Sequence, residues 1–442
     1  WSVNTPSFVF TALALAKIGA VVCTYNTYYR VEEMSSILYQ SDVELLFYGG
    51  GCKDTVYEDL IPDIKRRTPS VKHFYHIDEK EGGIWMSLDS FSENEKSAET
   101  IRQVRDAEKQ IDAQDPVFII FTSGTTEMPK GVVLTHYSVI NDALHTKHYM
   151  RWTEEDKMCV SAPMFHCFGL ITALVGCVTT GFTMHLLPYF RTATVWRAIT
   201  EYHCTIMIGV PSMYLALIHK SEYADLNGES LKSGIVGGSP LPPDEYEEIS
   251  ARFPNMHLQP SFGMTEMSAA VSFAGWDDSI EKKAVTVGRL MEDVEGRIVD
   301  PESGKVLGPN QRGEIQFRGF NVMKEYYKRP DKTAEAFTAD GWFRSGDIGY
   351  FNDEEELCIT GRLKDMIIRG GENISPMEIE EVILRSGMVE NVKVVGVPSK
   401  FRQEEVAACV IPKNGNILNM ESFYAFLKPR IASYKVPKFV LS

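Results

Sequence analysis

The chain has 442 residues, of which 44% are hydrophobic and 24% charged, and its formal net charge is −15. These proportions indicate a folded protein of two or three domains and exclude a disordered, collagen-like or disulfide-scaffolded chain. A net negative surface repels phosphate backbones, so we expect no nucleic-acid partner. The eight cysteines form no Cys-x-x-Cys pair, which predicts free thiols and a cytoplasmic location.

The first part of the chain alternates helical and strand-like segments. We expect helices over 8–17 and 29–40, and strands over 18–23, 43–48, 118–121, 158–161, 206–208 and 234–236. This alternation predicts an α/β protein with mainly parallel sheets and helices. Residues 50–115 are charged and weakly periodic, so we expect connecting structure there.

One segment requires a membrane test. Residues 158–190 contain no Asp, Glu, Lys or Arg, which formally makes them a candidate span. Two histidines, two prolines and several threonines interrupt the segment. We therefore expect a buried helix flanked by core strands, and no transmembrane segment.

The sequence pattern changes from Gly288 onward, where predicted strands become short and closely spaced. Short strand-like pieces at 296–299 and 313–317 predict a small antiparallel, β-barrel-like section. Helices are expected over 378–386 and 420–431, with strands over 389–397 and 406–411. We therefore predict a large N-terminal domain over 1–361, a hinge at 362–364 and a small mobile α+β domain over 365–442.

The first chemical motif is Phe121-Thr-Ser-Gly-Thr-Thr-Glu-Met-Pro-Lys-Gly131, which follows an apolar run. Hydroxyls and backbone amides around a glycine can bind phosphate oxygens, and Lys130 adds a positive charge. The spacing is not that of a P-loop, because Pro129 and Gly131 stand where glycine and Ser or Thr are needed. A solvated Ser/Thr turn is the plain alternative.

Three further motifs carry charged or hydroxyl groups in glycine-containing turns. In Ser261-Phe-Gly-Met-Thr-Glu266, the carboxylate could hold Mg²⁺ while the threonine contacts a phosphate. Gly341-Trp-Phe-Arg-Ser-Gly-Asp347 offers one carboxylate suited to two ribose hydroxyls. The segment from Gly361 to Pro376 joins a cation-rich turn to a glycine pair. Each has a structural alternative, namely a capped turn, an exposed salt bridge or a hairpin.

Together these motifs resemble the adenylate-forming (AMP-binding) superfamily, which includes acyl-CoA synthetases, firefly luciferase and peptide-synthetase adenylation domains. The resemblance runs from about residue 4 to the end, and Pro163-Met-Phe-His-Cys-Phe-Gly169 also fits it. It implies that a carboxylate oxygen attacks the α-phosphorus of ATP, giving an acyl-adenylate and pyrophosphate. A thiol then displaces AMP. The implied small molecules are a carboxylic acid, ATP, Mg²⁺ and coenzyme A.

The resemblance also assigns residues. The phosphates of ATP would be bound by Thr122, Ser123, Gly124, Thr125, Thr126, Lys130 and Thr265, the adenine by Gly238, Ser239, Pro240 and Phe262, and the ribose by Asp347 and Arg362. The acyl group would contact His166, Met213, Gly237, Gly238, Gly263 and Met264, and the thiol of CoA would pass Gly370 and Gly371. Glu266 would hold Mg²⁺ and Lys364 would be the pivot. The catalytic set would be Lys130, Thr265, Glu266, Arg362 and Lys364, while a packed core histidine is the alternative for His166.

Two features depart from the family pattern. Glu127 stands where the family usually has glycine, which should weaken ATP binding unless the side chain points outward. The chain stops at Ser442, before the family's Gly-Lys motif, so we expect a sequence trimmed at both ends.

The apolar residues expected around the acyl group favour a hydrophobic acid, such as a medium- or long-chain fatty acid. Three alternatives stay open: an aryl-acid CoA ligase, an acyl-AMP ligase that serves a carrier protein, and a non-catalytic nucleotide-binding homologue. The sequence does not indicate the oligomeric state.

Overall fold

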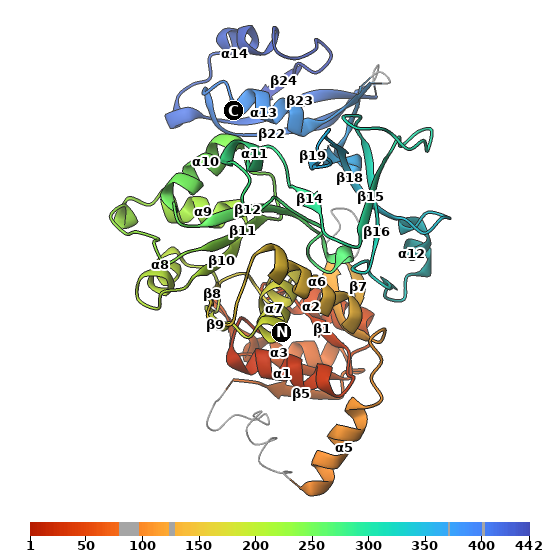
Figure 1. Ribbon diagram of the computed structural model, residues 1–442. Coiled ribbons are helices and arrows are strands. Elements are labelled where there is room, and N and C mark those ends of the chain that lie inside the picture. The colour runs from red at the N-terminus through yellow and green to blue at the C-terminus, as the bar shows by residue number, and fades with distance from the viewer. Residues whose placement is uncertain (79–96, 123–128, 370–371, 400–402) are drawn as a thin grey trace. The chain divides into compact units, whose positions relative to one another are not determined.

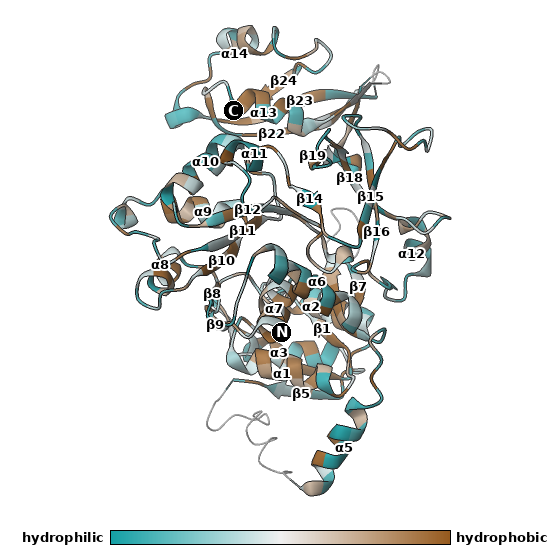
Figure 2. Cartoon of the chain, in the orientation of Figure 1, coloured by the Kyte–Doolittle hydropathy of each residue, from teal (hydrophilic) through white to brown (hydrophobic). Residues whose placement is uncertain are grey.

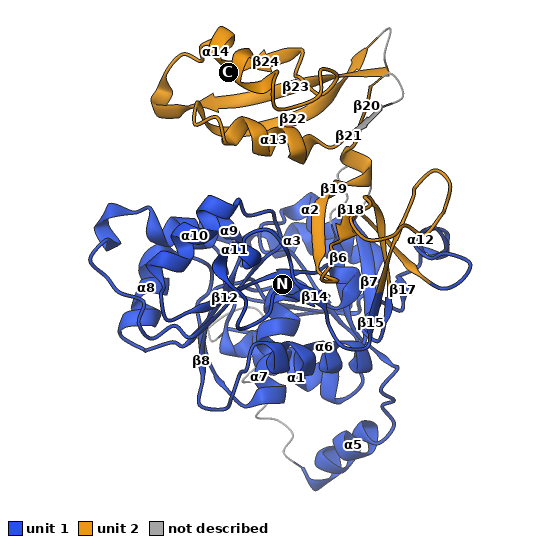
Figure 3. Ribbon diagram, turned by 45° about the horizontal axis from the view of Figure 1, so that its top comes forward, with its two compact units in different colours: residues 1–295, 318–341 blue, residues 296–317, 342–442 orange. Residues whose placement is uncertain are grey.

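The computed structural model describes residues 1–78, 97–122, 129–369, 372–399 and 403–442. It divides into two compact units (Figure 3). Unit 1 comprises residues 1–295 and 318–341, and unit 2 comprises residues 296–317 and 342–442. The predicted hinge at 362–364 lies inside unit 2. The predicted domains over 1–361 and 365–442 stay a prediction.

A seven-stranded sheet in unit 1 has the order β14-β13-β12-β11-β10-β8-β9 (Figure 1). Its strands are β8 (Lys157–Val160), β9 (Thr183–Leu186), β10 (Ile206–Gly209), β11 (Ser233–Gly237), β12 (His257–Phe262), β13 (Ser272–Phe273) and β14 (Arg289–Leu290). Neighbours from β9 to β12 are parallel, and β13 and β14 pair antiparallel. The predicted α/β part with mainly parallel pairing is confirmed for this sheet.

Three helices pack their apolar faces against this sheet: α8 (Thr192–Thr200), α9 (Pro211–Ile218) and α10 (Pro243–Arg252). Trp196, Tyr214 and Phe253 from these helices and the following turn belong to one buried core with strand residues. The Tyr214 hydroxyl lies 2.9 Å from the Met207 carbonyl oxygen and 3.0 Å from that of Ile235. A buried phenol is therefore hydrogen-bonded as well as packed.

A second sheet of unit 1 has the order β1-β6-β7-β17. Its strands are β1 (Val22–Thr24), β6 (Pro116–Thr122), β7 (Lys130–Thr135) and β17 (Glu325–Tyr326). β1 and β6 are parallel, whereas β7 pairs antiparallel with both β6 and β17. A Cβ atom on Gly131 would lie 2.9 Å from Ile119 Cγ2, so close packing inside the β6–β7 hairpin requires glycine there.

Helix α6 (His136–Tyr149) follows the hairpin in sequence. Unit 1 also contains α1 (Pro6–Lys17) near its start, and α11 (Ile280–Lys283) and α12 (Pro330–Ala336) later in the chain. Thr135 caps α6, because its hydroxyl accepts a hydrogen bond of 3.1 Å from the Ser138 backbone N–H. The Ser138 hydroxyl in turn accepts one from the Thr135 N–H. This reciprocal cap fixes the start of α6 directly after β7.

The expectation of connecting structure over 50–115 is wrong for much of that segment. It contains β3 (Gly51–Cys52), β4 (Thr55–Val56), α3 (Tyr57–Arg67), β5 (His73–His76) and α5 (Ala98–Glu108), while α2 (Val31–Ser41) and β2 (Leu45–Tyr48) precede it. In α3, Tyr57, Ile61 and Ile64 are buried at helical spacing among many charged residues, which hid the apolar stripe in the composition. Helix α5 buries no residue and is mostly hydrophilic (Figure 2).

The uncharged segment over 158–190 forms β8, a π-type helical turn η1 (Phe168–Val175), α7 (Gly176–Thr180) and β9. Seven of the eight residues of η1, all but Phe168, are buried. Among the described residues, no helix is long and apolar enough to span a membrane. The prediction of a buried helix between core strands is confirmed.

Unit 2 contains most of an antiparallel sheet, β15 (Val294–Val299), β16 (Gly313–Gly319), β18 (Phe343–Phe351) and β19 (Leu357–Arg362). A second sheet comprises β20 (Ile367–Arg369), β21 (Glu372–Ile374), β22 (Val389–Ser399), β23 (Gln403–Pro412) and β24 (Phe439–Leu441), with helices α13 (Pro376–Leu384) and α14 (Met420–Leu427). The predicted antiparallel and α+β elements are present. Closure into a barrel stays a prediction.

A buried amide ties the first residues to the seven-stranded sheet. Asn4 Nδ2 lies 3.0 Å from the Ala162 carbonyl oxygen and 3.1 Å from that of Leu187, beyond the ends of β8 and β9. Its Oδ1 accepts a 2.9 Å hydrogen bond from the Met164 N–H. The side chain therefore holds the segment that leads to His166.

We expect Asn4→Ala to lower the free energy of unfolding by about 2–3 kcal/mol, because several buried backbone groups lose their partner. Denaturant unfolding measures the change. Asn255→Ala is the matched control, since Asn255 is exposed and donates to the Glu229 carbonyl, and its effect should stay within about 0.5 kcal/mol. Equal effects of the two variants would contradict the anchoring role of Asn4.

Candidate active site

Parallel strands of unit 1 bring several predicted site residues to one edge of the seven-stranded sheet. β11 ends at Gly237 and runs into residues 238–240, β12 ends at Phe262, and β10 leads into α9 with Met213. β8 leads to the segment that contains His166. In open α/β sheets, ligands bind outside the carboxyl ends of the strands. The predicted adenine and acyl residues thus share the edge at which such sites form.

The predicted acyl-pocket glycines are explained by the backbone itself. A Cβ atom on Gly263 would lie 1.7 Å from the Ala269 carbonyl oxygen, and one on Gly237 would lie 2.7 Å from that of Ser261. Gly238 has φ of +83°, a conformation that side chains rarely adopt. Close backbone packing therefore requires these glycines, and their contact with an acyl group stays a prediction.

The predicted phosphate loop joins the two strands of the β6–β7 hairpin. Thr122, the last residue of β6, lies opposite Lys130, the first residue of β7. The Thr122 hydroxyl donates to the Lys130 carbonyl oxygen at 3.4 Å. Ser123, Gly124, Thr125 and Thr126, as well as the unusual Glu127, lie outside the described residues, and their predicted roles stay predictions.

A tyrosine that the motif analysis missed connects two of the predicted residues. Tyr326 is 5% exposed, and its hydroxyl donates a 2.7 Å hydrogen bond to Glu266 Oε1. Lys130 Nζ lies 4.3 Å from the centroid of the same ring, a cation–π contact. Burial, together with the Glu266 carboxylate, raises the pKa of Tyr326 well above its usual range, so the phenol stays protonated and donates.

The carboxylate of Glu266 fits a magnesium ion carried by a nucleotide. One oxygen accepts the Tyr326 hydroxyl, and an ionised carboxylate has further lone pairs to offer. Mg²⁺ is usually bound through one or two carboxylates together with substrate phosphates. The described residues contain no group of three or more His, Cys, Asp or Glu side chains that could hold a metal. The residues present therefore suit an ion that the nucleotide helps to hold.

A buried thiol lies between His166 and Thr265. Cys167 is 3% exposed, and its Sγ lies 3.5 Å from His166 Nδ1 and 3.7 Å from Thr265 Oγ1. The His166 ring and the Thr265 hydroxyl lower the pKa of Cys167 against the opposing effect of burial. The nearby sulfur raises the pKa of His166. The structure thus connects the predicted acyl-site histidine to the predicted phosphate-site threonine through Cys167, a residue to which the sequence analysis gave no role.

Within unit 2, the structure pairs the two residues predicted to bind ribose. Asp347 in β18 and Arg362 in β19 are cross-strand neighbours, and Arg362 Nε lies 3.0 Å from Asp347 Oδ1. Lys364 lies in η4, a single 3₁₀ turn over Leu363–Asp365 between β19 and β20. Gly370 and Gly371 lie outside the described residues. β18 and β19 pair antiparallel, and their register places Asp347 directly opposite Arg362. The two motifs that the sequence analysis assigned to ribose binding therefore meet in this pair.

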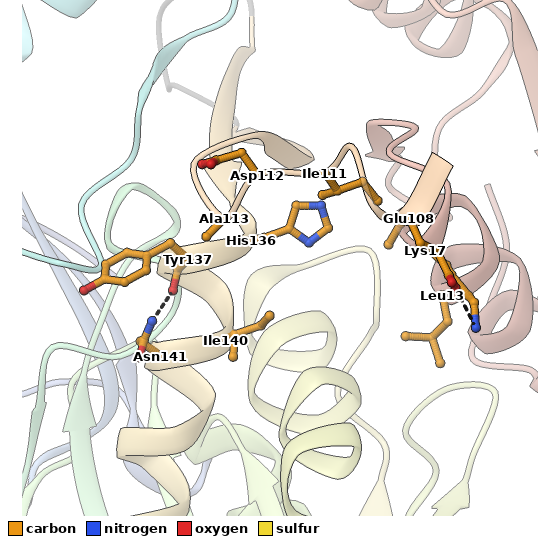
Figure 4. Close-up of a pocket in the computed structure, with 11 residues that line it drawn as sticks. Leu13, Lys17, Glu108, Ile111, Asp112, Ala113, His136, Tyr137, Ile140 and Asn141 are labelled. Carbon is orange, nitrogen blue, oxygen red and sulfur yellow. Dashed lines mark hydrogen bonds and ion pairs between the residues drawn. The ribbon is translucent and has the colours of Figure 1, made fainter. Parts of the chain in front are cut away.

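The hollow shown in Figure 4 lies elsewhere on unit 1. It has a volume of about 540 Å³ and is lined by residues of α1 and α6, by the end of α5 and by the segment between α5 and β6. Lys17 Nζ lies 2.9 Å from Glu108 Oε1 at one wall. None of the predicted site residues lines this hollow. It is therefore separate from the candidate active site.

Comparison with known families decides the class of protein. The model of the AMP-binding enzyme family matches residues 1–327. The chain belongs to the AMP-binding enzyme family. The model of the AMP-binding enzyme C-terminal domain also matches residues 378–442, so both parts of the family are represented here. The resemblance drawn from the motifs is confirmed.

Similar proteins cover the whole chain. YngI of Bacillus subtilis (strain 168), whose assignment as an acyl-CoA synthetase is provisional, is 34% identical over 100% of this chain and 82% of its own. The mitochondrial medium-chain acyl-CoA ligase ACSF2 of Danio rerio is 32% identical over 100% and 75%. The ATP-bound crystal structure of MatB from Rhodopseudomonas palustris has a TM-score of 0.84 at 26% identity, covering 100% of this chain and 83% of that one. The expectation of an AMP-forming acid–thiol ligase is confirmed for the family.

We expect Tyr326→Phe to lower the free energy of unfolding by about 1–2 kcal/mol, because Glu266 loses its phenol donor. The raised pKa of Tyr326 adds a pH dependence. The unfolded phenol ionises near pH 10 and the folded one only above that, so the stability that Tyr326 contributes declines as pH rises above 10.

Urea unfolding of wild type and Tyr326→Phe between pH 7 and 11 measures both effects, since the difference isolates Tyr326 from the other buried tyrosines. Tyr202→Phe serves as the control on an exposed ring. A stability difference that grows above pH 10 would contradict the assigned hydrogen bond.

Proposed function

We propose that this protein is an ATP-dependent acyl-CoA ligase that adenylates a hydrophobic carboxylic acid and transfers the acyl group to coenzyme A. The observation that carries the proposal is the chain of contacts from Lys130 through Tyr326 to Glu266. It places a cation and a magnesium-suited carboxylate beside the hairpin that supports the predicted phosphate loop. A polyanionic substrate with a bound Mg²⁺ needs this combination.

In the proposed first step, a carboxylate oxygen of the acid bonds to the α-phosphorus of ATP. The bond from that phosphorus to the bridging oxygen breaks, and pyrophosphate leaves with the electron pair. Lys130 and the hydroxyls at 122, 123, 125 and 126 hold the β- and γ-phosphates, and Thr265 contacts the α-phosphate. Glu266 would hold Mg²⁺ together with the phosphates, and the ion would neutralise phosphate charge. Phosphorus chemistry of this kind depends on positioning and charge neutralisation, which explains why no protein nucleophile is needed.

The nucleoside is proposed to lie between residues 238–240 and Phe262, with its ribose on Asp347. A carboxylate accepts two hydroxyl donors, and the Arg362 contact orients the Asp347 side chain. The exposed position of Gly238, Ser239 and Pro240 directly after β11 supports adenine binding there. The similarity to MatB, whose crystal structure contains bound ATP, supports the same ligand.

In the proposed second step, the thiolate of CoA attacks the acyl carbonyl, and AMP leaves. Gly370 and Gly371 are proposed to line the tunnel through which the pantetheine arm of CoA reaches the acyl group. Lys364 is proposed to serve as the pivot of the small domain. The position of Lys364 in a single 3₁₀ turn between two strands supports a pivot, because only a few backbone angles need to change there.

The acid is proposed to be a medium- or long-chain fatty acid. His166, Met213 and Met264 present one aromatic and two flexible apolar side chains, and unbranched methionines adapt to apolar ligands. The name of the Danio rerio relative, a medium-chain acyl-CoA ligase, supports the same substrate class.

A panel of acids tests this proposal on the full-length protein. Octanoate, palmitate, benzoate and acetate are compared by ATP–pyrophosphate exchange and by AMP release with and without CoA. We expect the fatty acids to give at least tenfold higher kcat/KM than acetate, and thioester to form with free CoA. Benzoate as the best acid would favour an aryl-acid ligase. Nucleotide binding without exchange would reject an enzyme, and exchange without thioester would favour transfer to a carrier protein.

We expect Glu266→Gln to reduce adenylation at least 100-fold, on the order of 3 kcal/mol in the barrier, while the protein remains folded. The neutral amide keeps an acceptor for Tyr326 but loses the charge that Mg²⁺ requires. Titration of exchange activity with Mg²⁺ measures the effect. Glu247→Gln on the exposed face of α10 is the matched control. Near-normal exchange in Glu266→Gln would remove this residue from the mechanism.

A further inference from the structure

A carboxyl group of helix α6 is fully buried next to the turn that follows Thr265 and Glu266. Asp142 is 0% exposed, and its Oδ2 accepts a 3.3 Å hydrogen bond from the backbone N–H of Ala270. Burying a carboxyl group is costly unless its neighbours compensate. Asp142 belongs to none of the sequence motifs, so its position calls for a separate explanation.

A buried asparagine holds the other side of the same residue. Asn321 is 0% exposed, and its Nδ2 donates a 2.8 Å hydrogen bond to the Ala270 carbonyl oxygen. The Ser268 hydroxyl donates to the Asn321 backbone oxygen at 2.8 Å. The backbone N–H and C=O of Ala270 are therefore bound by two side chains from distant parts of unit 1. Together these contacts form a brace around residues 268–270.

The braced turn has an unfavourable backbone. Ser268 has φ of +59° and Ala269 has φ of +145°, although neither is glycine. Such conformations persist only where the surrounding structure enforces them, and they are concentrated at functional sites. The turn begins directly after η3 (Thr265–Met267), in which the Ser268 N–H donates to the Thr265 carbonyl oxygen at 3.1 Å. A shift of the turn would therefore move Thr265 and Glu266.

We propose that Asp142 is a positioning residue, which together with Asn321 holds the turn over Ser268–Ala270 and thereby sets Thr265 and Glu266 for adenylation. The catalytic half of this proposal rests on the proposed function. The structural half, the brace itself, depends only on the contacts of Ala270. The two halves can therefore be tested separately.

A protonated Asp142 would complete the brace. Burial raises the pKa of Asp142 well above its usual range, against the Ala270 and Asn321 contacts, which lower it. Within the described part of the chain, neither Asp142 Oδ1 nor Asn321 Oδ1 receives a hydrogen bond in the geometry found. A neutral carboxyl group has an O–H to offer to the Asn321 oxygen. An amide at position 142 would likewise keep one donor and one acceptor.

Three variants separate the brace from general stability. Asp142→Ala removes both the donor and the acceptor, and Asp142→Asn keeps both. Thr146→Val is the matched control, because Thr146 lies one turn further along α6, is 0% exposed, and among the described residues its hydroxyl has no partner. Should Asp142→Ala not fold, Asp142→Ser replaces it, since its shorter side chain cannot reach the Ala270 amide.

Hydrogen–deuterium exchange of peptides covering 265–270 tests the brace. We expect exchange in Asp142→Ala to be at least roughly tenfold faster than in wild type, which corresponds to about 1.4 kcal/mol. Asp142→Asn should restore protection, and Thr146→Val should match wild type. Unchanged exchange in Asp142→Ala, or equal acceleration in Thr146→Val, would overturn the proposal.

ATP–pyrophosphate exchange with the best acid tests the catalytic half. We expect kcat to fall at least tenfold in Asp142→Ala with a smaller change in the KM for the acid, and to recover to within threefold of wild type in Asp142→Asn. Faster hydrogen exchange with normal kcat would overturn the positioning role. A wild-type protein that exchanges no pyrophosphate with any acid would instead reject the proposed function, and the hydrogen-exchange comparison would still decide the brace.

Discussion

The hydrogen bond from Tyr326 to Glu266 is the contact on which the candidate site depends, because it joins two separate sheets. Tyr326 lies in β17, at the edge of the sheet that contains the β6–β7 hairpin. Glu266 follows β12 of the seven-stranded sheet. The backbone of Glu266 is also bound to the segment before β17, through the Met323 N–H at 2.8 Å. The phenol contact adds the side-chain link that sets the Glu266 carboxylate beside the ring that Lys130 contacts. The tyrosine ring contacts both groups and is itself buried.

This arrangement also explains how an acidic protein can hold an anionic substrate. A net charge of −15 gives no long-range attraction for a nucleotide. Under the proposed function, Lys130, the backbone amides of the predicted phosphate loop and the Glu266 carboxylate must therefore supply the favourable electrostatics locally. Lys130 lies over an aromatic ring and is only partly exposed, so its charge is less screened than that of a surface lysine. The arrangement of nearby groups, and not the net charge of the protein, therefore provides the attraction for the anion.

The sequence predicted features that depend on local pattern. The parallel strands β8, β10 and β11 are short apolar runs, and helix α13 has an amphipathic stripe, so each could be recognised from its own residues. Helix α3 was missed because its apolar positions are few among charged ones. Residues 123–126 and 370–371 were assigned by family motif, and the structure adds nothing on them.

The part of the site that sequence reasoning missed consists of contacts between distant segments. Tyr326 is 60 residues from Glu266 in the chain, and Asp142 is 128 residues from Ala270. No periodicity or spacing connects such pairs, because only the packing of complete elements brings them together. A buried Asp in an otherwise ordinary helix gives a weak signal, since the sequence does not show which face the helix buries.

The close approach of Gly263 to the Ala269 carbonyl oxygen has a consequence for redesigning acid specificity. In engineering a binding pocket, glycines that line it are attractive positions, since any side chain added there fills space. Here the added atom would meet backbone at 1.7 Å rather than open volume. A library that varies position 263 would therefore mostly sample misfolded chains. Methionine already stands at positions 213 and 264 of the proposed acyl pocket, so a substitution there adds no Cβ atom to the main chain.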